Sequence, residues 1–515
     1  MSIDRIRFHV IPVVILTLFS FVHSLATRFT FFSRPTTPYG HDAGIFAYIG
    51  YAMQNGKILY TQVWDNKGPL LYVINWLGVS INYYHGIYVL ELIALLVTAL
   101  FSYRLALLIT KRNRVIATCA TMFSMSLLVV TLEGGNLSEE YALPFISIAL
   151  FYAAKYFYNQ LLLKWYEFVI IGCCFAAVLL LRANICAVFI PLFVVVCIAR
   201  ITHRQAKQLL VDIGWVLAGV ALFLIPFIVY LWSNGALGRC VADAYMNALG
   251  DFEPISKLTH VSNTYKMISK TMMTGAPFVV VLFMITYLAV LRKRVISSSG
   301  LRAVLAISFW GLLVNLLANS LSGAMQMHYF ITFVPILVPA TAWLLVLLFR
   351  WIHDASTRFK SLAGNIVTIA VVLLIGMQGF SGIVDKVMST AGYERGTQGN
   401  EVYHYVLENS EPDDLIQVFG EDVTLNYRTQ RHAASSYVVL APGRFSQKMV
   451  SHMANEIARD LEANPPKLIL FGSDSQYERF VQGATLFDVE SFLADHYDKQ
   501  VVDFDFIVYM AKPIS

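Results

Sequence analysis

Charged residues are scarce in this chain. Only 14% of its 515 residues are Asp, Glu, Lys or Arg, against about 25% in an average soluble protein. Hydrophobic residues make up 57%, and the mean hydropathy is +0.61. A soluble fold has too little interior to bury so much apolar surface, and a disordered chain would be far more polar. The composition therefore excludes both classes and predicts a polytopic α-helical membrane protein.

Cysteine is also rare, and signatures of nucleotide binding are missing. Five of the six cysteines lie in apolar runs, and only Cys240 lies in a polar segment. Their spacing fits neither a disulfide framework nor a zinc site. The chain contains no GxGxxG motif and no P-loop. These absences exclude a disulfide-stapled secreted domain and give no ground for a nucleotide cofactor.

Long apolar runs are what the chain has in abundance. A spanning helix needs about 20 mostly apolar residues, and about eleven segments meet this requirement: 8–26, 86–109, 115–132, 141–158, 165–181, 184–201, 210–232, 276–292, 302–320, 329–350 and 363–380. A further apolar stretch, 69–82, is too short to span comfortably. We expect it to form an interfacial helix.

The basic residues orient these spans. With the N-terminus inside, 18 of the 27 Lys and Arg residues of segment 1–382 lie at the inner ends, as the positive-inside rule requires. If 69–82 crossed the membrane, the run KRNR at 111–114 would face outward. The N-terminus is therefore predicted inside, which leaves two long outer loops, 27–85 and 233–275.

The last part of the chain has a different composition. Residues 383–515 hold 20 of the 33 acids but only 11 of the 38 bases, a net charge of −9, whereas residues 1–382 carry +14. The runs DDLIQVFG and PPKLILFG are typical of buried strands, SQKMVSHMANEIARDLEA has helical periodicity, and KQVVDFDFIVYMAKP is typical of a closing strand or hairpin. We predict a transmembrane domain over 1–382 and an extracytoplasmic α/β domain over 383–515.

The first outer loop holds the most informative residues, in the stretch PYGHDAGIFAYIGYAMQNGKILYTQVWDNKGPLLYVINWLGV at 38–79. Asp42 begins a predicted amphipathic helix, 43–54, and Gly56 would end it. Asp65 and Lys67 follow, just before the short apolar helix. Carboxylates and a lysine are thus expected at the membrane surface, between two interfacial helices.

This arrangement resembles the GT-C integral-membrane glycosyltransferases, in particular the bacterial branch similar to protein O-mannosyltransferases and to the aminoarabinose transferases of lipid A. The resemblance rests on Asp42, on Met53 and Gly56, and on WDNKGPLLYVINWLG. It extends to EGGNLSEEYALP at 133–144 and to SGAMQMHYFITFVP at 322–335. A soluble α/β domain after the last span is also common among these enzymes. The similarity therefore covers most of the chain.

The resemblance implies a sugar transfer at the outer face of the bacterial inner (plasma) membrane. The donor would be a polyprenyl-phosphate-linked sugar, and the acceptor a cell-envelope glycan or lipid such as an O-antigen. Inversion at the sugar needs one base, so Asp42 is the candidate general base. The leaving phosphate needs cations, for which we predict Lys67 and Arg182. The candidate substrate contacts are Asp65, Glu139, Glu140, His328 and Tyr329.

One position departs from the relatives. They tend to carry an Asp-Glu pair at the catalytic position, whereas this chain has His41-Asp42-Ala43. The role of the second acid would then fall elsewhere, for example to Glu139 or Glu140. His41 beside Asp42 also raises the question of a metal, but one such pair is not ligand spacing. We expect no required cofactor, with a divalent cation as the alternative.

Structural roles compete with each of these assignments. Asp42 could cap a helix, and Glu139 and Glu140 could stabilise the start of a span. Asp65, Lys67 and Arg182 could be surface or snorkelling groups. The aromatic side chains of Trp64, Tyr72 and Trp76 are predicted to belong to an interfacial belt.

Other functions also fit a polytopic chain. A lipid or polysaccharide transporter or flippase would need charges at the bilayer midplane and broken, repeated helices. An O-antigen polymerase or ligase would share the large outer loops, and a membrane scaffold would need only a binding tail. No nucleic-acid partner is expected, because the orientation of the spans accounts for the positive charge.

Overall fold

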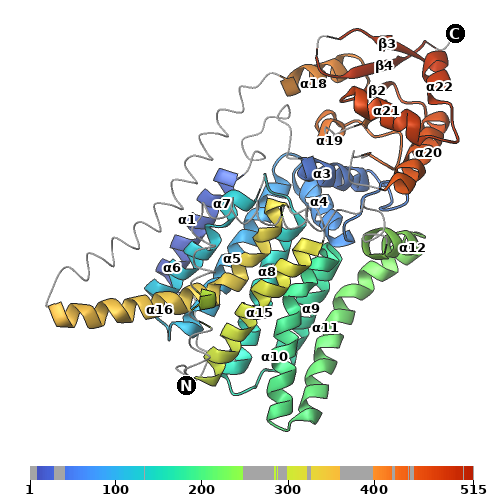
Figure 1. The fold of residues 1–515 in the computed structure, drawn as a ribbon. Helices are drawn as coiled ribbons and strands as arrows, with labels where there is room; N and C mark the ends of the chain where they lie inside the picture. The colour runs from blue at the N-terminus through green and yellow to red at the C-terminus, as the bar shows by residue number, and fades with distance from the viewer. Residues whose placement is uncertain are drawn as a thin grey trace.

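The computed structural model describes residues 9–27, 41–132, 134–246, 298–321, 326–359, 398–419, 424–438, 446–502 and 504–513, with isolated positions at 262, 283–285, 287 and 440. These residues are mostly helical. The helices form a bundle with a small domain at one end, beside the short helices α3 and α4 (Figure 1). Below, the outer end of the bundle is the end that carries α3 and α4, and the inner end is the opposite one.

The bundle helices follow the predicted apolar runs closely. Their bounds are α1 Val10–Thr27, α5 Gly86–Ile109, α8 Ser138–Tyr158, α9 Trp165–Leu181, α10 Phe189–Thr202, α11 Ala206–Ser233, α15 Ser299–Leu321 and α16 Phe333–Phe359. The predicted spans 276–292 and 363–380 and most of the loop 233–275 lie outside the described residues.

Five helical segments in the described part of the chain are long and apolar enough to cross a membrane: Gly86–Ile109, Ala183–Thr202, Ala206–Ser233, Ser299–Asn319 and Met327–Arg350. Several exposed apolar side chains on α11, such as Leu210, Leu217 and Leu222, fit a surface that faces lipid. These features support a multi-pass membrane protein. The count of eleven spans and their orientation stay predictions.

Three predicted spans are less regular than expected. The run 115–132 forms two helices, α6 Arg114–Met125 and α7 Leu128–Thr131, with a break between them. The 3₁₀ segments η2 Ala183–Val188 and η6 Met327–Thr332 lead into α10 and α16. Both 3₁₀ segments lie at the outer end, where the backbone tightens before entering the bundle.

Two short helices of the first outer loop lie on top of the bundle. Helix α3 spans His41–Gln54, and Gly56, with φ of +84°, follows its end. Helix α4 spans Pro69–Ile81, begins with a proline and is only 13 residues long, so the predicted short helix is confirmed. The two helices pack against each other, and α4 also packs on α5 and α9.

The C-terminal domain is built on the predicted strands. Its four-stranded sheet has the order β1-β2-β4-β3. Strand β1 (Ile416–Phe419) is parallel to β2 (Leu468–Phe471), with Ile416 opposite Leu468. Strand β4 (Ile507–Ala511) is antiparallel to both β2 and β3 (Tyr497–Gln500). The expected hairpin is therefore present.

Alternating side chains of the strands build two apolar layers. Phe419, Ile469 and Phe471 face α20 and α21, whereas Ile416 and Leu468 face α18 and α19. The helix bounds are α18 Gln398–Glu408, α19 Thr424–Thr429, α20 Gln447–Ala463, α21 Asp474–Gly483 and α22 Val489–His496. The result is a three-layer α/β domain, as predicted in outline.

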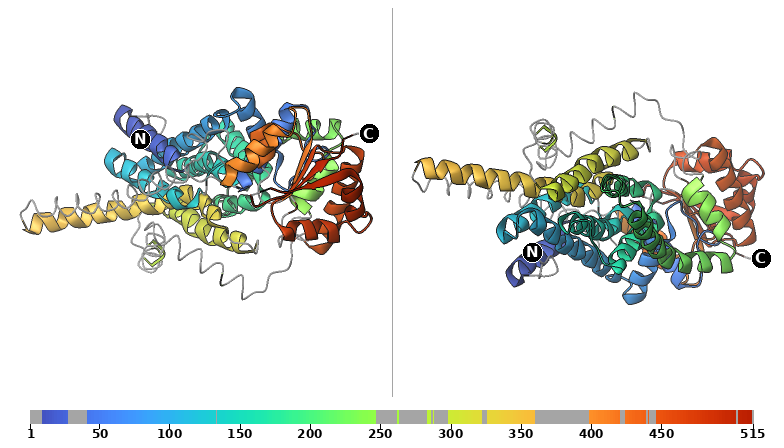
Figure 2. Two further views of the ribbon diagram at one scale, coloured as in Figure 1. Left: turned by 90° about the horizontal axis from the view of Figure 1, so that it is seen from above. Right: turned by 90° about the horizontal axis from the view of Figure 1, so that it is seen from below.

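The domain rests directly on the first outer loop. Helix α19 packs on α3, and Gly44 is the point of closest approach, because a Cβ atom there would lie 2.0 Å from Cγ2 of Thr424. Figure 2 shows the domain on one side of the bundle, opposite the projecting end of α16. The C-terminal domain thus covers part of the outer end.

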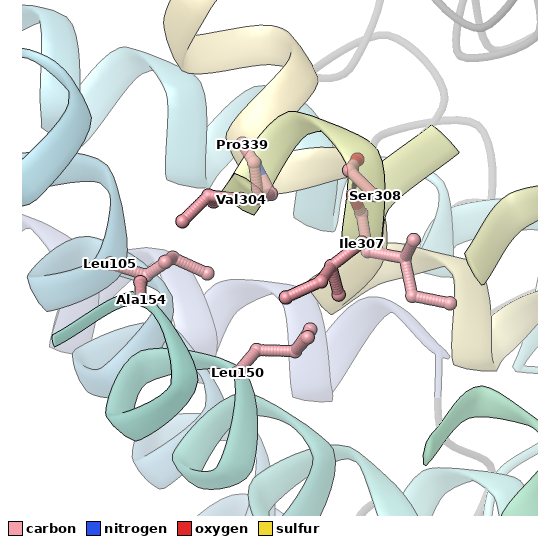
Figure 3. A pocket seen from close by; sticks show the side chains of 8 residues that line it. Leu105, Leu150, Ala154, Val304, Ile307, Ser308 and Pro339 are labelled. Carbon is pink, nitrogen blue, oxygen red and sulfur yellow. Dashed lines mark hydrogen bonds between the residues drawn. The ribbon is translucent and has the colours of Figure 1, made fainter. Parts of the chain in front are cut away.

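A small apolar pocket lies inside the bundle, between α5, α8, α15 and α16 (Figure 3). Its rim includes Ser308, whose hydroxyl donates to the carbonyl of Ile336 at 2.6 Å. The other lining side chains are those of Leu105, Leu150, Ala154, Val304, Ile307 and Pro339. Because it lacks charged groups, this pocket is no candidate for phosphate or sugar chemistry.

Candidate functional site

Asp42 lies in the first turn of α3, partly buried. The next residue, Ala43, is buried, and its carbonyl accepts a hydrogen bond of 3.0 Å from Nδ2 of Asn136. Gly44 then touches Thr424 of the C-terminal domain. The candidate base is therefore held between the second outer loop and the C-terminal domain.

Asp65 and Lys67 lie in a tight turn that leads into α4. The backbone N–H of Asn66 donates to Oδ1 of Asp65 at 2.7 Å, and the hydroxyl of Tyr72 donates to Oδ2 at 2.8 Å. Burial, together with the charge of Asp65, raises the pKa of Tyr72 well above its ordinary value. The phenol therefore stays protonated and keeps the turn closed. Each carboxylate oxygen of Asp65 therefore accepts one hydrogen bond within this turn.

Among the described residues, the Lys67 side chain forms no ion pair with an acid. Its Nζ donates to Oδ1 of Asn66 at 2.8 Å, which is a neutral partner. Its backbone is fixed more firmly, because its N–H donates to Oη of Tyr72 and its carbonyl accepts from the hydroxyl of Tyr60 at 2.7 Å. The backbone that carries the ammonium group is therefore held in place by two tyrosine hydroxyls.

A backbone contact brings Lys67 and Arg182 together. The N–H of Gly68 donates to the carbonyl of Leu181 at 3.1 Å. A Cβ atom at position 68 would lie 2.1 Å from the carbonyl oxygen of Leu180, so only glycine permits this approach. Lys67 and Arg182 are the chain neighbours of the two bonded residues. Two cations that are far apart in the sequence therefore flank one hydrogen bond.

Arg182 also joins two other elements at the outer end, α8 and η6. Its guanidinium pairs with Glu139, donates to the hydroxyl of Tyr329 at 2.9 Å, and lies 4.5 Å from the centre of that ring. The ring of His328 meets that of Tyr329 edge-on at 4.8 Å. Oε2 of Glu139 accepts from the hydroxyl of Ser138 at 2.8 Å. This group includes four of the predicted site residues.

The Glu139 side chain is buried and ionised. Glu139 precedes the predicted span 141–158, in the first turn of α8. Burial alone would raise its pKa, but the Arg182 guanidinium, with smaller contributions from His328 and Ser138, holds the pKa below its ordinary value. A buried carboxylate is stable only with such partners. The pair with Arg182 therefore leaves the guanidinium partly neutralised.

The structure sorts the predicted residues into two groups and two outliers. Asp65 and Lys67 form one turn, and Glu139, Arg182, His328 and Tyr329 form one cluster, with the backbone bond between Gly68 and Leu181 joining the two groups. Asp42 lies on α3, outside both groups, and Asn136 holds the neighbouring carbonyl of Ala43. Glu140 is fully buried in the same turn as Glu139. The roles assigned to these residues stay predictions.

The aromatic belt prediction is wrong for two of its three residues. Tyr72 is fully buried beneath the turn of Asp65. Trp64 is also buried; its ring packs at 4.9 Å from that of Tyr437, and its Nε1 donates to Asp243 at 2.8 Å. Trp76 is 40% exposed, as an interfacial residue would be. The physical reason is that the C-terminal domain covers Trp64, whereas Tyr72 packs inside the loop against Phe46 and Tyr60.

Several polar residues at the site were missed from the sequence. Asn136 and Asn75 are fully buried and hydrogen-bonded to each other at 2.8 Å. The carboxylate of Glu91 accepts from the N–H of Asn136. One signal was available, since the motif GGN at 134–136 is typical of a backbone that needs left-handed conformations. Its partners could not be read from spacing.

The described part of the chain offers no obvious metal centre. Its His, Cys, Asp and Glu side chains include no group of three arranged to hold an ion. The thiols of all six cysteines are free.

Comparison with solved structures identifies the fold. ArnT from Cupriavidus metallidurans, solved bound to undecaprenyl phosphate and in the apo state, is similar with a TM-score of 0.62 at 12% identity, over 98% of this chain and 99% of ArnT. The oligosaccharyltransferase AglB from Archaeoglobus fulgidus, solved with an inhibitory peptide and a dolichol-phosphate, has a TM-score of 0.51 at 13% identity, over 98% of this chain and 74% of AglB. Both neighbours are GT-C proteins, so the resemblance predicted from the loop motifs is confirmed for the fold.

A comparison with curated proteins finds no match. The family described as "Putative competence-induced protein Ccs4 N-terminal domain" matches residues 4–346. This segment covers about two thirds of the chain and includes every candidate site residue from Asp42 to Tyr329. The chain therefore belongs to the competence-induced Ccs4 N-terminal domain family.

Proposed function

We propose that this protein is a GT-C glycosyltransferase that takes a sugar from a polyprenyl-phosphate carrier at the outer end of the bundle. The proposal places eleven spans in a bacterial inner membrane, with the N-terminus inside and the C-terminal domain outside. The acceptor would be a cell-envelope glycan or lipid, such as an O-antigen. Two neighbours of the same fold were solved with undecaprenyl phosphate or dolichol-phosphate, which supports a carrier of this class.

The observation that carries the proposal is the approach of Lys67 to Arg182. The hydrogen bond between Gly68 and Leu181 holds their backbones side by side at the predicted membrane surface. A lysine and an arginine together can bind a phosphate through several charge-assisted hydrogen bonds. The backbone bond itself needs no cation on either side, and Glu139 neutralises only Arg182, so a positive charge remains on Lys67. An anionic group between them would balance that charge.

The reaction would need one base and one anion site. The carboxylate of Asp42 would take the proton of the acceptor hydroxyl as its oxygen attacks the anomeric carbon. The bond from that carbon to the phosphate oxygen would break, with inversion, and the bonding electron pair would leave with the polyprenyl phosphate. Lys67 and Arg182 would stabilise the charge that develops on this phosphate.

The remaining candidate residues would shape the donor site. Glu139 sets the orientation of Arg182, and Tyr329 supports its guanidinium from the other side. His328, Glu140 and Asp65 would line the space near the sugar. The C-terminal domain would limit access to Asp42, because α19 lies on the first turn of α3. No step of this mechanism uses a metal ion.

The proposal can be tested on the carrier alone, before the sugar is known. Undecaprenyl phosphate is titrated into the purified protein, and Kd is measured for the wild type, Lys67→Met, Arg182→Met and the double variant. Each single variant should weaken binding about tenfold, which corresponds to about 1.4 kcal/mol. The double variant should lose less than the sum, because both cations contact the same phosphate.

Lys57→Met is the matched control, since Lys57 lies in the same loop and has no role in the proposed site. It should bind the carrier like the wild type. Equal affinity in all variants would reject the phosphate site.

The function itself is tested by incubating the protein with a panel of labelled undecaprenyl-phosphate sugars and envelope extracts. Movement of the carrier across vesicles without sugar transfer would instead support a flippase, and extension of a polymer on its own carrier would support a polymerase.

A further inference from the structure

The Asn136 side chain makes three hydrogen bonds at the outer end. One of its amide hydrogens is donated to the carbonyl of Ala43 at 3.0 Å, and another hydrogen bond, of 2.8 Å, goes to Oδ1 of Asn75. Its Oδ1 accepts from the hydroxyl of Tyr141 at 3.0 Å, and its backbone N–H donates to Glu91. One fully buried residue thus ties together helices α3, α4, α5 and α8.

The loop is built to deliver this side chain. Gly134, Gly135 and Asn136 have φ of +99°, +84° and +56°. Two glycines adopt such angles without steric cost, and asparagine tolerates the third better than most residues. The chain accepts three consecutive left-handed residues, and the result is an amide in the middle of four helices. A structural turn alone would not need the amide to be buried and fully bonded.

The bond to Ala43 acts next to the candidate base. Asp42 precedes Ala43 in the first turn of α3, where a helix would otherwise fray. Asn136 holds this turn from the bundle side, and Thr424 packs on Gly44 from the side of the C-terminal domain. The backbone on which the Asp42 carboxylate stands is therefore clamped from both sides.

We infer that Asn136 is a positioning residue for Asp42: its amide fixes the first turn of α3 so that the carboxylate meets the acceptor hydroxyl. This inference rests on the proposed function. Asn136 acts through the carbonyl of Ala43, without touching the substrate. Because its Nδ2 faces two acceptors, only a donor serves at this position; a carboxylate would place oxygen against oxygen, beside buried Glu91.

Two variants test the inference in the full-length protein. Asn136→Ala removes the clamp, and Asn136→Asp keeps the shape but reverses the polarity. With a labelled undecaprenyl-phosphate sugar, each should lower kcat about 100-fold, the loss expected from a displacement of about 1 Å at a reacting group. The KM for the donor should change less than about threefold, because Lys67 and Arg182 are unaffected.

A double-mutant cycle separates positioning from general damage. In an Asp42→Asn background, Asn136→Ala should cause no further fall in the residual rate, because there is no longer a base to position. An equal loss in both backgrounds would overturn the inference. Ser124→Ala is the control, since it removes a buried hydrogen bond of 3.2 Å to Thr341 elsewhere in the bundle. It should leave kcat within about twofold.

Hydrogen exchange gives a readout that does not depend on turnover. In the Asn136→Ala protein, peptides covering 41–50 should exchange at least about tenfold faster, while peptides of α11 keep their wild-type rate. Unchanged exchange at 41–50 would overturn the clamp even if transfer is lost. If the wild-type protein transfers no sugar from any donor in the panel, the proposed function is rejected. Faster exchange at 41–50 in Asn136→Ala would still support the contact between Asn136 and the first turn of α3.

Discussion

Charged side chains at the two ends of the bundle are paired in different ways. At the inner end, Lys155 pairs with Glu167 at 2.7 Å and Arg200 pairs with Asp212 at 2.7 Å, each across a separation of 12 residues. At the outer end, Arg182 pairs with Glu139 across 43 residues and contacts Tyr329 across 147. Inner pairs close neighbouring helices, whereas outer contacts join distant parts of the chain.

The difference separates structural charge from candidate functional charge. An inner pair forms as soon as two consecutive helices pack, and Gln205 and Gln208 complete the hydrogen bonds of Arg200 and Asp212. Its partners are satisfied within one hairpin. The outer cluster needs α8, η6 and the end of α9 to be in place, and the backbone bond from Gly68 to Leu181 joins it to the turn that carries Lys67. Charges that converge only in the finished fold are the ones we assign to binding and catalysis.

Replacing the proposed base should produce the largest effect and would test the comparison most directly. Asp42→Asn removes the carboxylate and keeps its size, so kcat should fall about 10²–10⁴-fold. The Kd for undecaprenyl phosphate should stay within about threefold, because the anion site is separate. Single-turnover transfer assays measure the first value and titration the second. Asp243→Asn serves as the control, since Asp243 accepts a hydrogen bond from Trp64 and is no candidate site residue. Wild-type transfer by Asp42→Asn would mean that this carboxylate is not the base.

Breaking one pair at each end sharpens the contrast. Glu139→Gln and Asp212→Asn each leave a buried guanidinium without its counter-charge, which should cost about 2–4 kcal/mol of unfolding free energy. Both should therefore lower Tm. Only Glu139→Gln should alter carrier binding, and it should tighten the Kd about threefold to tenfold, because Arg182 is no longer neutralised. If Asp212→Asn changed this Kd as much, the division between the two ends would fail.

The strength of docking between the C-terminal domain and α3 should depend on pH, with a smaller effect than the substitutions above. His432 stacks on Tyr51 at 4.9 Å, and burial, with a smaller contribution from Lys57, lowers its pKa. A lowered pKa in the docked state means that docking is strongest above the ordinary histidine range and weakens as pH falls below about 6.5. Proteolysis of the domain should therefore quicken between pH 7.5 and 5.5. His432→Phe keeps the stack without titrating, so it should remove this dependence.

Metal removal should have the smallest effect of all. The proposed outer site relies on Lys67 and Arg182 for charge, so transfer after dialysis against EDTA should stay within about twofold of the untreated rate. Loss of transfer on EDTA treatment, restored by added Mg²⁺ or Zn²⁺, would show that two cationic side chains do not suffice.

Local features of the fold were accessible from the sequence. The bounds of α5 and α9 match the predicted spans, because long apolar runs between polar residues define a helix without reference to other parts. The strands and helix α20 were also predicted from local sequence, in this case from the periodicity of their apolar residues. The break in 115–132 was missed because its apolar composition continues across Ser126.

The site was predictable as a set of residues but not as an arrangement. Loop position singled out Asp42, Lys67, Glu139 and Arg182. What the sequence could not supply was the contact of Gly68 with Leu181, the place of Asn136 among four helices, or the burial of Trp64 under the C-terminal domain. Each of these includes at least one contact between residues more than 50 positions apart, and no local pattern specifies such a partner.

The close contact between Gly44 and Thr424 also determines when this part of the protein can fold during synthesis. These residues are 380 positions apart, and at roughly 5–20 residues per second the ribosome needs about 20–80 s to reach the second after the first. During that interval α3 has no contact with the C-terminal domain. Tyr48 and Tyr51 of α3 then lack their partners Ala433 and His432. Docking of the C-terminal domain on α3 is therefore expected among the final events of maturation, after the ribosome has passed Thr424 and His432.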